Sequence, residues 1–429
     1  MTIDKEKVFQ YHEHPQPGKL AVVPTKPCQK AEDLSLAYTP GVAIPCEEIK
    51  ANPSLAYEYT SKGNLVAVIS NGTAVLGLGD IGPLAGKPVM EGKSLLFKRF
   101  AGIDAIDIDV AENDPQKLVE IVASLEPTFG GINLEDIKAP QCFRVEEELI
   151  SRLKIPVFHD DQQGTAVVLS AALLNALELI GKKIDEVKVV FSGAGAAAVA
   201  SAKMLLELGL SRKNLFLVDS KGLINLKRKE GLNEYKLQFA QDSELNTLQE
   251  VLRGADVFIG VSAGNLLSKE MVQAMNTKPI IFALSNPTPE ISYDDAKEAV
   301  PEAVVATGRS DYPNQVNNVL CFPFLFRGAL DVRAKVINKE MKLAAIKTLA
   351  SLAKKKVPKS VVKAYGREFS FGAEYILPKP FDPRLLPEVA AAVAKAAMDS
   401  GVAGKNINLK EYKIMLKKKA SRLAKGKFL

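Results

Sequence analysis

Residues 187–200 read VKVVFSGAGAAAVA, and this stretch decides the fold of the larger part of the chain. An apolar run leads into a glycine turn, and a run of small residues with helical character follows. This order indicates a buried strand, a tight turn and a helix start, which is how a dinucleotide-binding unit begins. Gly193 permits the tight turn, Gly195 lets the backbone approach phosphates, and the small Ala198 lets the helix pack closely on the strand.

Helix-like and strand-like segments alternate regularly around this turn. Residues 165–180 predict a helix of about 16 residues that stops at Gly181. The strand-like runs that follow are 187–192, 215–219, 256–262, 279–285 and 304–308, and the helical patterns between them are 196–209, 248–255 and 268–275. Strands that alternate with helices predict a parallel, doubly wound sheet. We therefore expect an α/β fold with a Rossmann-like domain over residues 163–390.

The first half of the chain predicts a separate α/β domain over residues 1–162. Its apolar, strand-like runs are 65–70, 74–79, 104–110 and 155–160, and its helical patterns are 91–102, 116–125 and 140–153. Residues 1–60 are rich in proline and predict an extended arm with a short helix near Glu47. Residues 330–400 are again helical and rich in Ala and Lys, and residues 391–429 predict a basic helical extension.

A second glycine motif, GLGDIG at residues 77–82, fits the dinucleotide pattern letter for letter but stands in the wrong context. Pro83, Gly86 and Pro88 follow at once, so we expect no helix to begin there and no helix N-terminus to face a phosphate. We predict a tight turn between strands at this place. The next helix is expected only near Glu91, which would put Lys93 at its start.

Four carboxylates follow two strand-like runs. Glu135 and Asp136 end the run GGINLED, and Asp160 and Asp161 end the run IPVFHDD. Apolar neighbours predict that these side chains are largely buried, and buried carboxylates need a cation or hydrogen-bond donors. Oxygen ligands of this kind hold Mg²⁺ or Mn²⁺. A divalent metal beside a nicotinamide cofactor indicates oxidation of a hydroxy acid, with loss of CO₂.

Other polar residues are candidates for the same chemistry. Lys93 lies among small and apolar residues, and a desolvated lysine near a metal would have a lowered pKa and act as a base. Tyr38, on a turn before Pro40, is a candidate acid. Asn286 and Asn318 follow strand-like runs, where amide side chains can orient a nicotinamide or a carboxylate.

Asp219 ends the second strand of the dinucleotide unit, where a carboxylate would hold a ribose 2′-hydroxyl and favour NAD. Ser220 and Lys221 follow directly, and residues 227–229 read KRK, which could equally hold the 2′-phosphate of NADP. The choice between NAD and NADP therefore stays open.

Composition restricts the protein class. Hydrophobic residues make up 47% and charged residues 25% of the 429 positions, which are ordinary values for a globular protein. The start lacks the apolar region of a signal peptide, and four scattered cysteines suit reduced thiols in the cytoplasm. Residues 405–429 hold eight Lys and one Arg against one Glu, so the other 404 residues carry a net charge of −2. We expect a solvated basic helix there, with no nucleic-acid or membrane partner.

Several motifs in combination resemble the malic enzyme family, in its short prokaryotic type. They are PGKLAVVPTKP, LAYTPGVA, GLGDIGPLAGKPVMEGK, INLEDIKAP, FHDDQQGTA, FSGAGAAA, ALSNPT and NQVNNV, and the similarity as a whole runs from about residue 11 to about residue 390. The resemblance implies a homodimer that oxidises and decarboxylates malate to pyruvate with NAD or NADP and Mg²⁺ or Mn²⁺. It also implies that the first domain binds malate and metal and the second binds the coenzyme.

The resemblance implies a role for each candidate residue. Tyr38 would be the proton donor and Lys93 the general base, with Asp160 near Lys93. The metal ligands would be Glu135, Asp136 and Asp161. The residues expected to line or contact the coenzyme are Gly193, Ala194, Gly195, Ala196, Ala197, Asp219, Asn286 and Asn318, the two asparagines contacting either coenzyme or substrate. Two alternatives remain: a metal-dependent dehydrogenase of another hydroxy acid, such as tartrate, and a dinucleotide-binding sensor without catalysis.

Overall fold

A four-stranded parallel sheet forms the centre of the first half of the chain. The structure, a computed structural model, describes residues 4–428. The strands are β1 (Leu65–Ser70), β2 (Asp104–Asp109), β3 (Gly131–Leu134) and β4 (Val157–His159), in the order β2-β1-β3-β4. Its helices are α5 (Gly82–Ala101), α6 (Pro115–Ser124) and α7 (Gln141–Arg152). Because the strands are all parallel, the residues after β1, β3 and β4 meet at one edge of the sheet.

The second half contains a six-stranded sheet in the order β10-β9-β8-β5-β6-β7. The strands are β5 (Val189–Ser192), β6 (Leu215–Asp219), β7 (Gly222–Leu223), β8 (Val257–Gly260), β9 (Ile280–Ala283) and β10 (Val304–Thr307). All pairs are parallel except β6 with β7, a short hairpin that the alternation of apolar runs did not predict. The predicted parallel, doubly wound sheet is confirmed.

Helices cover this sheet and connect it to the first. They are α8 (Thr165–Ile180), α9 (Ala196–Glu207), α10 (Glu234–Leu237), α11 (Leu248–Leu252), α12 (Lys269–Gln273) and α13 (Tyr293–Ala299). Helix α8 ends at Gly181, whose φ of 71° is the left-handed cap that the sequence predicts. By length and composition residues 160–180 could cross a membrane, but 67% of that window is buried inside the protein. The apolar character of α8 therefore reflects its place in the core between the two sheets.

The helices that follow the second sheet return to the first domain. They are α14 (Phe322–Asp331), α15 (Lys339–Ala353), α16 (Lys359–Tyr365), α17 (Leu385–Asp399) and α18 (Leu409–Ala424). Helices α14 and α18 pack on α5, and α15 packs on α8. The ring of Phe97 on α5 meets the rings of Phe322 and Phe326 edge-on, with centroids 4.8 and 5.2 Å apart. This buried aromatic cluster fixes α14 against α5.

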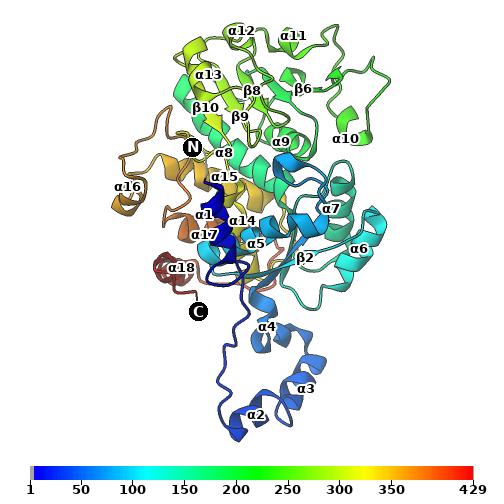
Figure 1. Cartoon of the computed structure of the whole chain (residues 1–429), viewed down its shortest axis with the longest axis vertical. Helices are drawn as coiled ribbons and strands as arrows, with labels where there is room; N and C mark the ends of the chain where they lie inside the picture. The colour runs from blue at the N-terminus through cyan, green and yellow to red at the C-terminus, as the bar shows by residue number, and fades with distance from the viewer. Residues whose placement is uncertain (1–3, 429) are drawn as a thin grey trace.

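The N-terminal residues form a lobe that projects from the rest of the molecule, seen in blue in Figure 1. The projecting lobe contains α2 (Ala31–Ala37), α3 (Ala43–Ala51) and α4 (Ala56–Tyr59), whereas α1 (Lys5–Glu13) precedes the lobe and is not part of it. None of these four helices has a buried residue. An irregular segment between α1 and α2 contacts α5 where the Lys19 N–H donates to Glu91. Helix α3 includes Glu47, as predicted. We call residues 31–59 the arm lobe.

Two local predictions in the first domain are wrong. Helix α5 begins at Gly82, nine residues before the predicted start near Glu91. Pro83 stands in its first turn, where the missing N–H would have no partner in any case, and the helix tolerates Pro88 further on. The run 74–79 is also no strand, since residues Leu76–Leu78 form a short 3₁₀ turn that leads from β1 into α5.

Candidate active site

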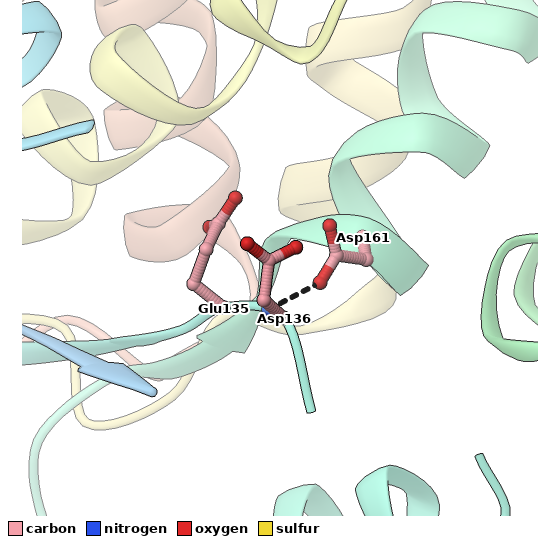
Figure 2. A group of neighbouring side chains, drawn as sticks. All are labelled: Glu135, Asp136 and Asp161. Atoms are coloured by element: carbon pink, nitrogen blue, oxygen red, sulfur yellow. Dashed lines mark hydrogen bonds between the residues drawn. The ribbon is translucent and has the colours of Figure 1, made fainter. Parts of the chain in front are cut away.

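The predicted metal ligands meet at the carboxyl edge of the four-stranded sheet. Strands β3 and β4 pair in parallel with Leu134 opposite His159, so the residues that follow each strand lie side by side. Ligand oxygens of Glu135, Asp136 and Asp161 all lie within 4.8 Å of one another. Figure 2 shows the three carboxylates gathered on one side of the ribbon, with the Asp136 N–H donating to Asp161 Oδ2 over 2.8 Å.

This cluster has the charge and burial of a cation site. Glu135 and Asp136 are 5% and 3% exposed. Burial raises the pKa of Glu135, and the neighbouring carboxylates of Asp161, Asp160 and Asp136 raise it further, against the opposing effect of Lys93. Like charges at this distance in a buried place require a counter-charge. Three carboxylate oxygens suit a hard divalent ion such as Mg²⁺ or Mn²⁺, so the donor set fits the expected metal.

Lys93 lies directly beside these ligands. Its Nζ is 2.5 Å from Asp160 Oδ2 and 2.8 Å from Glu135 Oε1, and it stands 4.2 Å from the centroid of the Phe322 ring. Because α5 begins early, Lys93 lies in the second half of the helix instead of at its start. The family resemblance implied that Asp160 lies near Lys93, and the structure places the two side chains in contact although 67 residues separate them.

The structure favours the protonated form of Lys93, whereas the sequence predicted a lowered pKa for this residue. Burial by itself would lower the pKa of the Lys93 ammonium, but the combined attraction of Asp160 and Glu135 outweighs burial and raises the pKa above its ordinary value. Both carboxylates approach within hydrogen-bond distance, so the charged form of the lysine is strongly favoured. The sequence showed a lysine in apolar surroundings and gave no sign of this second carboxylate contact.

Asp160 is fully buried and is fixed from several directions. Its main-chain oxygen accepts a hydrogen bond from Asn318 Nδ2 over 3.2 Å. A side chain at Gly164 would collide with it, because a Cβ there would lie 1.9 Å from Asp160 Oδ1. Asn318 is held in turn by Thr165, whose hydroxyl donates to Asn318 Oδ1 over 3.1 Å. The structure therefore places Asn318 against the metal edge of the sheet.

The glycine turn after β5 leaves room for a ligand. Gly193 has a φ of +123°, and a Cβ there would lie 2.9 Å from the Val261 oxygen, so only glycine suits the position. At Gly195 an added Cβ would meet no atom within 4 Å, which means that the space above the turn is open. Ala196 and Ala197 begin α9 and are half-buried, while Ala194 is buried. A dinucleotide phosphate fits such an open helix N-terminus.

Asp219 stands at the end of β6, beside this turn, but it is not free. Its carboxylate contacts Arg228 at 2.8 Å and Lys236 at 2.7 Å. Although burial opposes it, hydrogen bonds from Arg228, Lys236 and the Lys221 N–H lower the pKa of Asp219 to about 2. Asp219 is thus ionised and already paired, which the sequence did not reveal.

Asn286 is exposed in the loop after β9, next to the glycine motif of the first domain. A Cβ at Gly77 would lie 2.4 Å from the Asn286 main-chain oxygen and 2.7 Å from the ring of Pro287. The motif at residues 77–82 forms a turn and packs against a loop of the second domain, but the predicted turn between two strands is wrong, because helix α5 begins at Gly82. Glycine is required at position 77 because two loops meet there.

Tyr38 is not brought to the other candidates within this chain. It caps α2 in the arm lobe and is 69% exposed. Figure 1 shows α2 at the outer end of that lobe, far from α5 and α7. Any contact between Tyr38 and the carboxylate cluster would need a rearrangement of the lobe or a second molecule.

Other buried polar groups at this site were missed by sequence reasoning. Glu290 is fully buried, and its two oxygens accept the N–H groups of Ser262 and Ser285 at 3.1 Å, which fixes the loops after β8 and β9. Gln163, which is half-buried, bridges Glu146 and Lys342. No local pattern marks either group, because each also depends on a distant partner, Ser262 for Glu290 and Lys342 for Gln163.

Comparison with known proteins agrees with this geometry. The family model described as "Malic enzyme, N-terminal domain" matches residues 17–150, and "Malic enzyme, NAD binding domain" matches residues 162–363. A protein of Salmonella typhimurium named "NADP-dependent malic enzyme" is 59% identical over 94% of this chain and 53% of its own length. One of Rhizobium meliloti named "NAD-dependent malic enzyme" is 54% identical over 94% of this chain and 53% of its own length.

A solved structure agrees over nearly its whole length. The crystal structure of a malic enzyme from Pyrococcus horikoshii has a TM-score of 0.89 and 44% identity, covering 98% of this chain and 96% of that one. The chain spans about half the length of the curated relatives it matches. Both family models and the fold point the same way, and the chain belongs to the malic enzyme family.

Proposed function

We propose that this chain oxidises (S)-malate to pyruvate and CO₂ with reduction of NAD or NADP, in a reaction that depends on Mg²⁺ or Mn²⁺. The observation that carries the proposal is the contact of Lys93 with both Glu135 and Asp160, directly beside a cluster of three carboxylates. The names of the relatives from Salmonella typhimurium and Rhizobium meliloti support it. The glycine turn at residues 193–195, with open space above it, supports a dinucleotide as the oxidant.

The metal would be held by Glu135, Asp136 and Asp161. When bound, a divalent metal supplies Lewis-acid polarisation of the substrate oxygens, and the nicotinamide supplies the hydride acceptor. A divalent cation held by Glu135 and its neighbours would offset the carboxylate charge that raises the pKa of Lys93. Lys93 Nζ, as the neutral amine, would then accept the proton of the malate C2 hydroxyl and later return it. Asp160, at 2.5 Å from Nζ, fixes the position of the amine through both transfers.

Tyr38 is proposed as the acid that protonates the carbon from which CO₂ has left. Since the arm lobe lies away from the site of its own chain, we propose that Tyr38 acts in the site of a second copy. Apolar side chains exposed on the same lobe support such a contact, because a second copy would bury them. They are Leu34, Leu36, Val42, Ile44 and Tyr59. The protein would then be a homodimer whose two sites each need both chains.

We propose that the two sheets belong to domains that bind different molecules. Residues 1–162 would bind malate and metal, residues 163–390 the coenzyme, and residues 391–429 form the basic helical extension. Malate and a second copy of the chain are the proposed partners, with no nucleic acid and no membrane, and we propose a cytoplasmic protein. The burial of α8 supports a role for this apolar helix in the core rather than in a membrane.

The decisive experiment follows two products in one assay. Purified protein is incubated with (S)-malate and Mn²⁺, with NAD⁺ and NADP⁺ in parallel, while reduced coenzyme and pyruvate are measured. Equal amounts of the two products are expected. Reduced coenzyme without pyruvate would mean a dehydrogenase that does not decarboxylate. No turnover with malate would overturn the substrate, and D-malate and tartrate would then be assayed under the same conditions.

A further inference from the structure

The carboxylate of Asp219 has no acceptor site left for a ribose. A carboxylate offers about four lone-pair positions. In this structure Oδ1 accepts from the Lys221 N–H at 2.9 Å and from Arg228 Nη1 at 2.8 Å, while Oδ2 accepts from Arg228 Nη2 at 2.8 Å and from Lys236 Nζ at 2.7 Å. An NAD-selecting carboxylate must accept hydrogen bonds from the ribose hydroxyls. Asp219 could do so only by giving up one of these partners.

The same contacts gather positive charge at this edge of the sheet. Arg228 Nη2 and Lys236 Nζ both donate to the main-chain oxygen of Gly231, at 3.4 and 3.2 Å. A Cβ at Gly231, whose φ is +67°, would lie 3.1 Å from Lys221 Cδ and 2.9 Å from Arg228 Nη2. Glycine at this position therefore lets three cationic side chains converge. A second carboxylate, that of the exposed Glu230, lies 3.3 Å from Lys221 Nζ.

The cationic side chains differ in how many of their hydrogen bonds are already made within the protein. The side chains of Arg228 and Asp219 are only 11% and 12% exposed, so this pair is fixed within the loop. All five N–H donors of Arg228 are already used. Lys221, in contrast, is 54% exposed, and its partner Glu230 is 84% exposed. Exposed pairs of this kind are weak, so the Lys221 ammonium is available to a ligand.

We propose that Asp219 serves as a positioning residue for a site that selects the 2′-phosphate of NADP over the 2′-hydroxyl of NAD. Lys221 and Lys236 supply the charge that recognises the phosphate, and Arg228 holds Asp219 away from the ribose. The three cations outnumber Asp219 and Glu230 by one, which favours a dianionic group over a neutral hydroxyl. This inference rests on the proposed use of a nicotinamide coenzyme and names which coenzyme that is.

The test uses adenosine fragments that need no turnover. Binding of 2′,5′-ADP and of 5′-ADP to the full chain is measured by titration calorimetry at low and at moderate salt. We expect 2′,5′-ADP to bind about tenfold or more tightly, as one or two charge-assisted hydrogen bonds predict, with a preference that shrinks as salt rises. Equal affinities for the two fragments would overturn the inference.

Charge-removing variants locate the preference. Lys221→Gln and Lys236→Gln should each weaken 2′,5′-ADP about tenfold and leave 5′-ADP unchanged, which also shows that the site is folded. Lys227→Gln is the matched control, since Lys227 lies in the same loop but pairs with Glu244. An equal loss in all three variants would mean a general charge effect and would contradict the assignment.

The outcomes separate this inference from the proposed function. If the protein prefers 2′,5′-ADP but does not oxidise malate, the inference that it selects NADP is supported and malate is excluded as its substrate. Malate oxidation at equal efficiency with NAD⁺ and NADP⁺ would leave the proposed function standing and remove the inference. In the wild-type enzyme we expect kcat/KM for NADP⁺ to exceed that for NAD⁺ by about tenfold or more, and Lys221→Gln to narrow the ratio.

Discussion

Asn318 and Asp160, 158 residues apart in the sequence, are joined by a hydrogen bond of 3.2 Å from the Asn318 amide to the Asp160 main-chain oxygen. The other end of the amide accepts a bond from Thr165, at the start of α8. Asp160 in turn contacts Lys93. The segment after β10 therefore helps to position Asp160, which contacts the proposed base Lys93. Asn318 thus acts on Lys93 indirectly, through Asp160.

The first prediction concerns this link. Asn318→Ala leaves a buried carbonyl and a hydroxyl without their partner, which costs about 1–3 kcal/mol of stability and loosens Asp160. We expect kcat to fall about tenfold with a smaller change in KM for malate, as measured by steady-state kinetics. Asn317→Ala is the control, because the Asn317 side-chain oxygen accepts a hydrogen bond from the nearby Val319 N–H within the same turn. Equal losses in both variants would show that the effect is local to the turn.

The second prediction concerns the metal. Asp161 is the most exposed of the three ligands, with 33% of its side chain accessible, so Asp161→Asn should fold normally. Mn²⁺ binding, followed by calorimetry or electron paramagnetic resonance, should weaken by about tenfold or more while 2′,5′-ADP binding is retained. Asp80→Asn removes a neighbouring surface carboxylate that pairs with Lys138 and should change neither. If Asp161→Asn loses both Mn²⁺ binding and 2′,5′-ADP binding, the variant has a folding defect.

The third prediction tests whether Tyr38 acts across two chains. Lys93→Ala alone should lose a factor of about 10² or more in kcat, as expected for a general base, and Tyr38→Phe should be strongly impaired as well. If each site takes Tyr38 from its partner, co-expression of the two variants in equal amounts restores one site in every mixed dimer. Activity should then reach about a quarter of the wild-type value, because half of the dimers are mixed.

Two results would contradict the arrangement. If each chain supplies its own Tyr38, every site in a mixed dimer still lacks one residue, and the mixture is no more active than its parents. A chain that sediments as a monomer at working concentration would exclude the arrangement independently. Leu34→Glu, on the exposed face of α2, provides a separate check, since it should weaken dimers while leaving each chain folded.

Regular parts of the fold could be predicted from the sequence because their signals are local. Helix α8 and strands β5, β6, β8, β9 and β10 follow from apolar periodicity and from glycine caps. Helix α5 was predicted too short, since proline and glycine were weighed as helix breakers although Pro83 stands in the first turn. Packing of α5 against α14 and α18 stabilises the helix, and no local pattern carries that information.

The candidate site divides in the same way. The carboxylates after β3 and β4 could be found because parallel strands bring their ends together. The paired state of Asp219 could not, since Arg228 reaches it from an irregular loop and Lys236 from the short helix α10, 9 and 17 residues further on. The raised pKa of Lys93 also depends on side-chain geometry, as two carboxylates outweigh burial only at hydrogen-bond distance. Sequence patterns indicate which groups meet but not how their charges balance.

The last prediction concerns the basic helix α18, whose residue Lys419 lies partly buried against α5. A Cβ added at Gly102, which follows α5, would lie 3.3 Å from Lys419 Cδ. Burial lowers the pKa of Lys419 to about 8, and the nearby charges of Arg327 and Lys98 act in the same direction. Asp331 and Asp104 oppose this shift but do not cancel it. Between pH 8 and the ordinary lysine value near 10.5, the unfolded chain binds a proton that the folded chain lacks. The contribution of Lys419 to the unfolding free energy therefore rises with pH across this window. Below pH 8 both states are protonated and the full cost of burying the ammonium is present.

Lys419→Met keeps the apolar stem and removes the charge, so it should raise the melting temperature at pH 7 by about 2 °C. The difference from the wild-type protein should shrink towards pH 10, where the folded lysine is neutral. Lys418→Met, at the exposed neighbouring position on α18, should show no such change with pH. Melting curves of the three proteins at pH 7, 8.5 and 10 decide the point. A stabilisation of Lys419→Met that is the same at every pH would mean that better packing, and not the loss of a buried charge, is its cause.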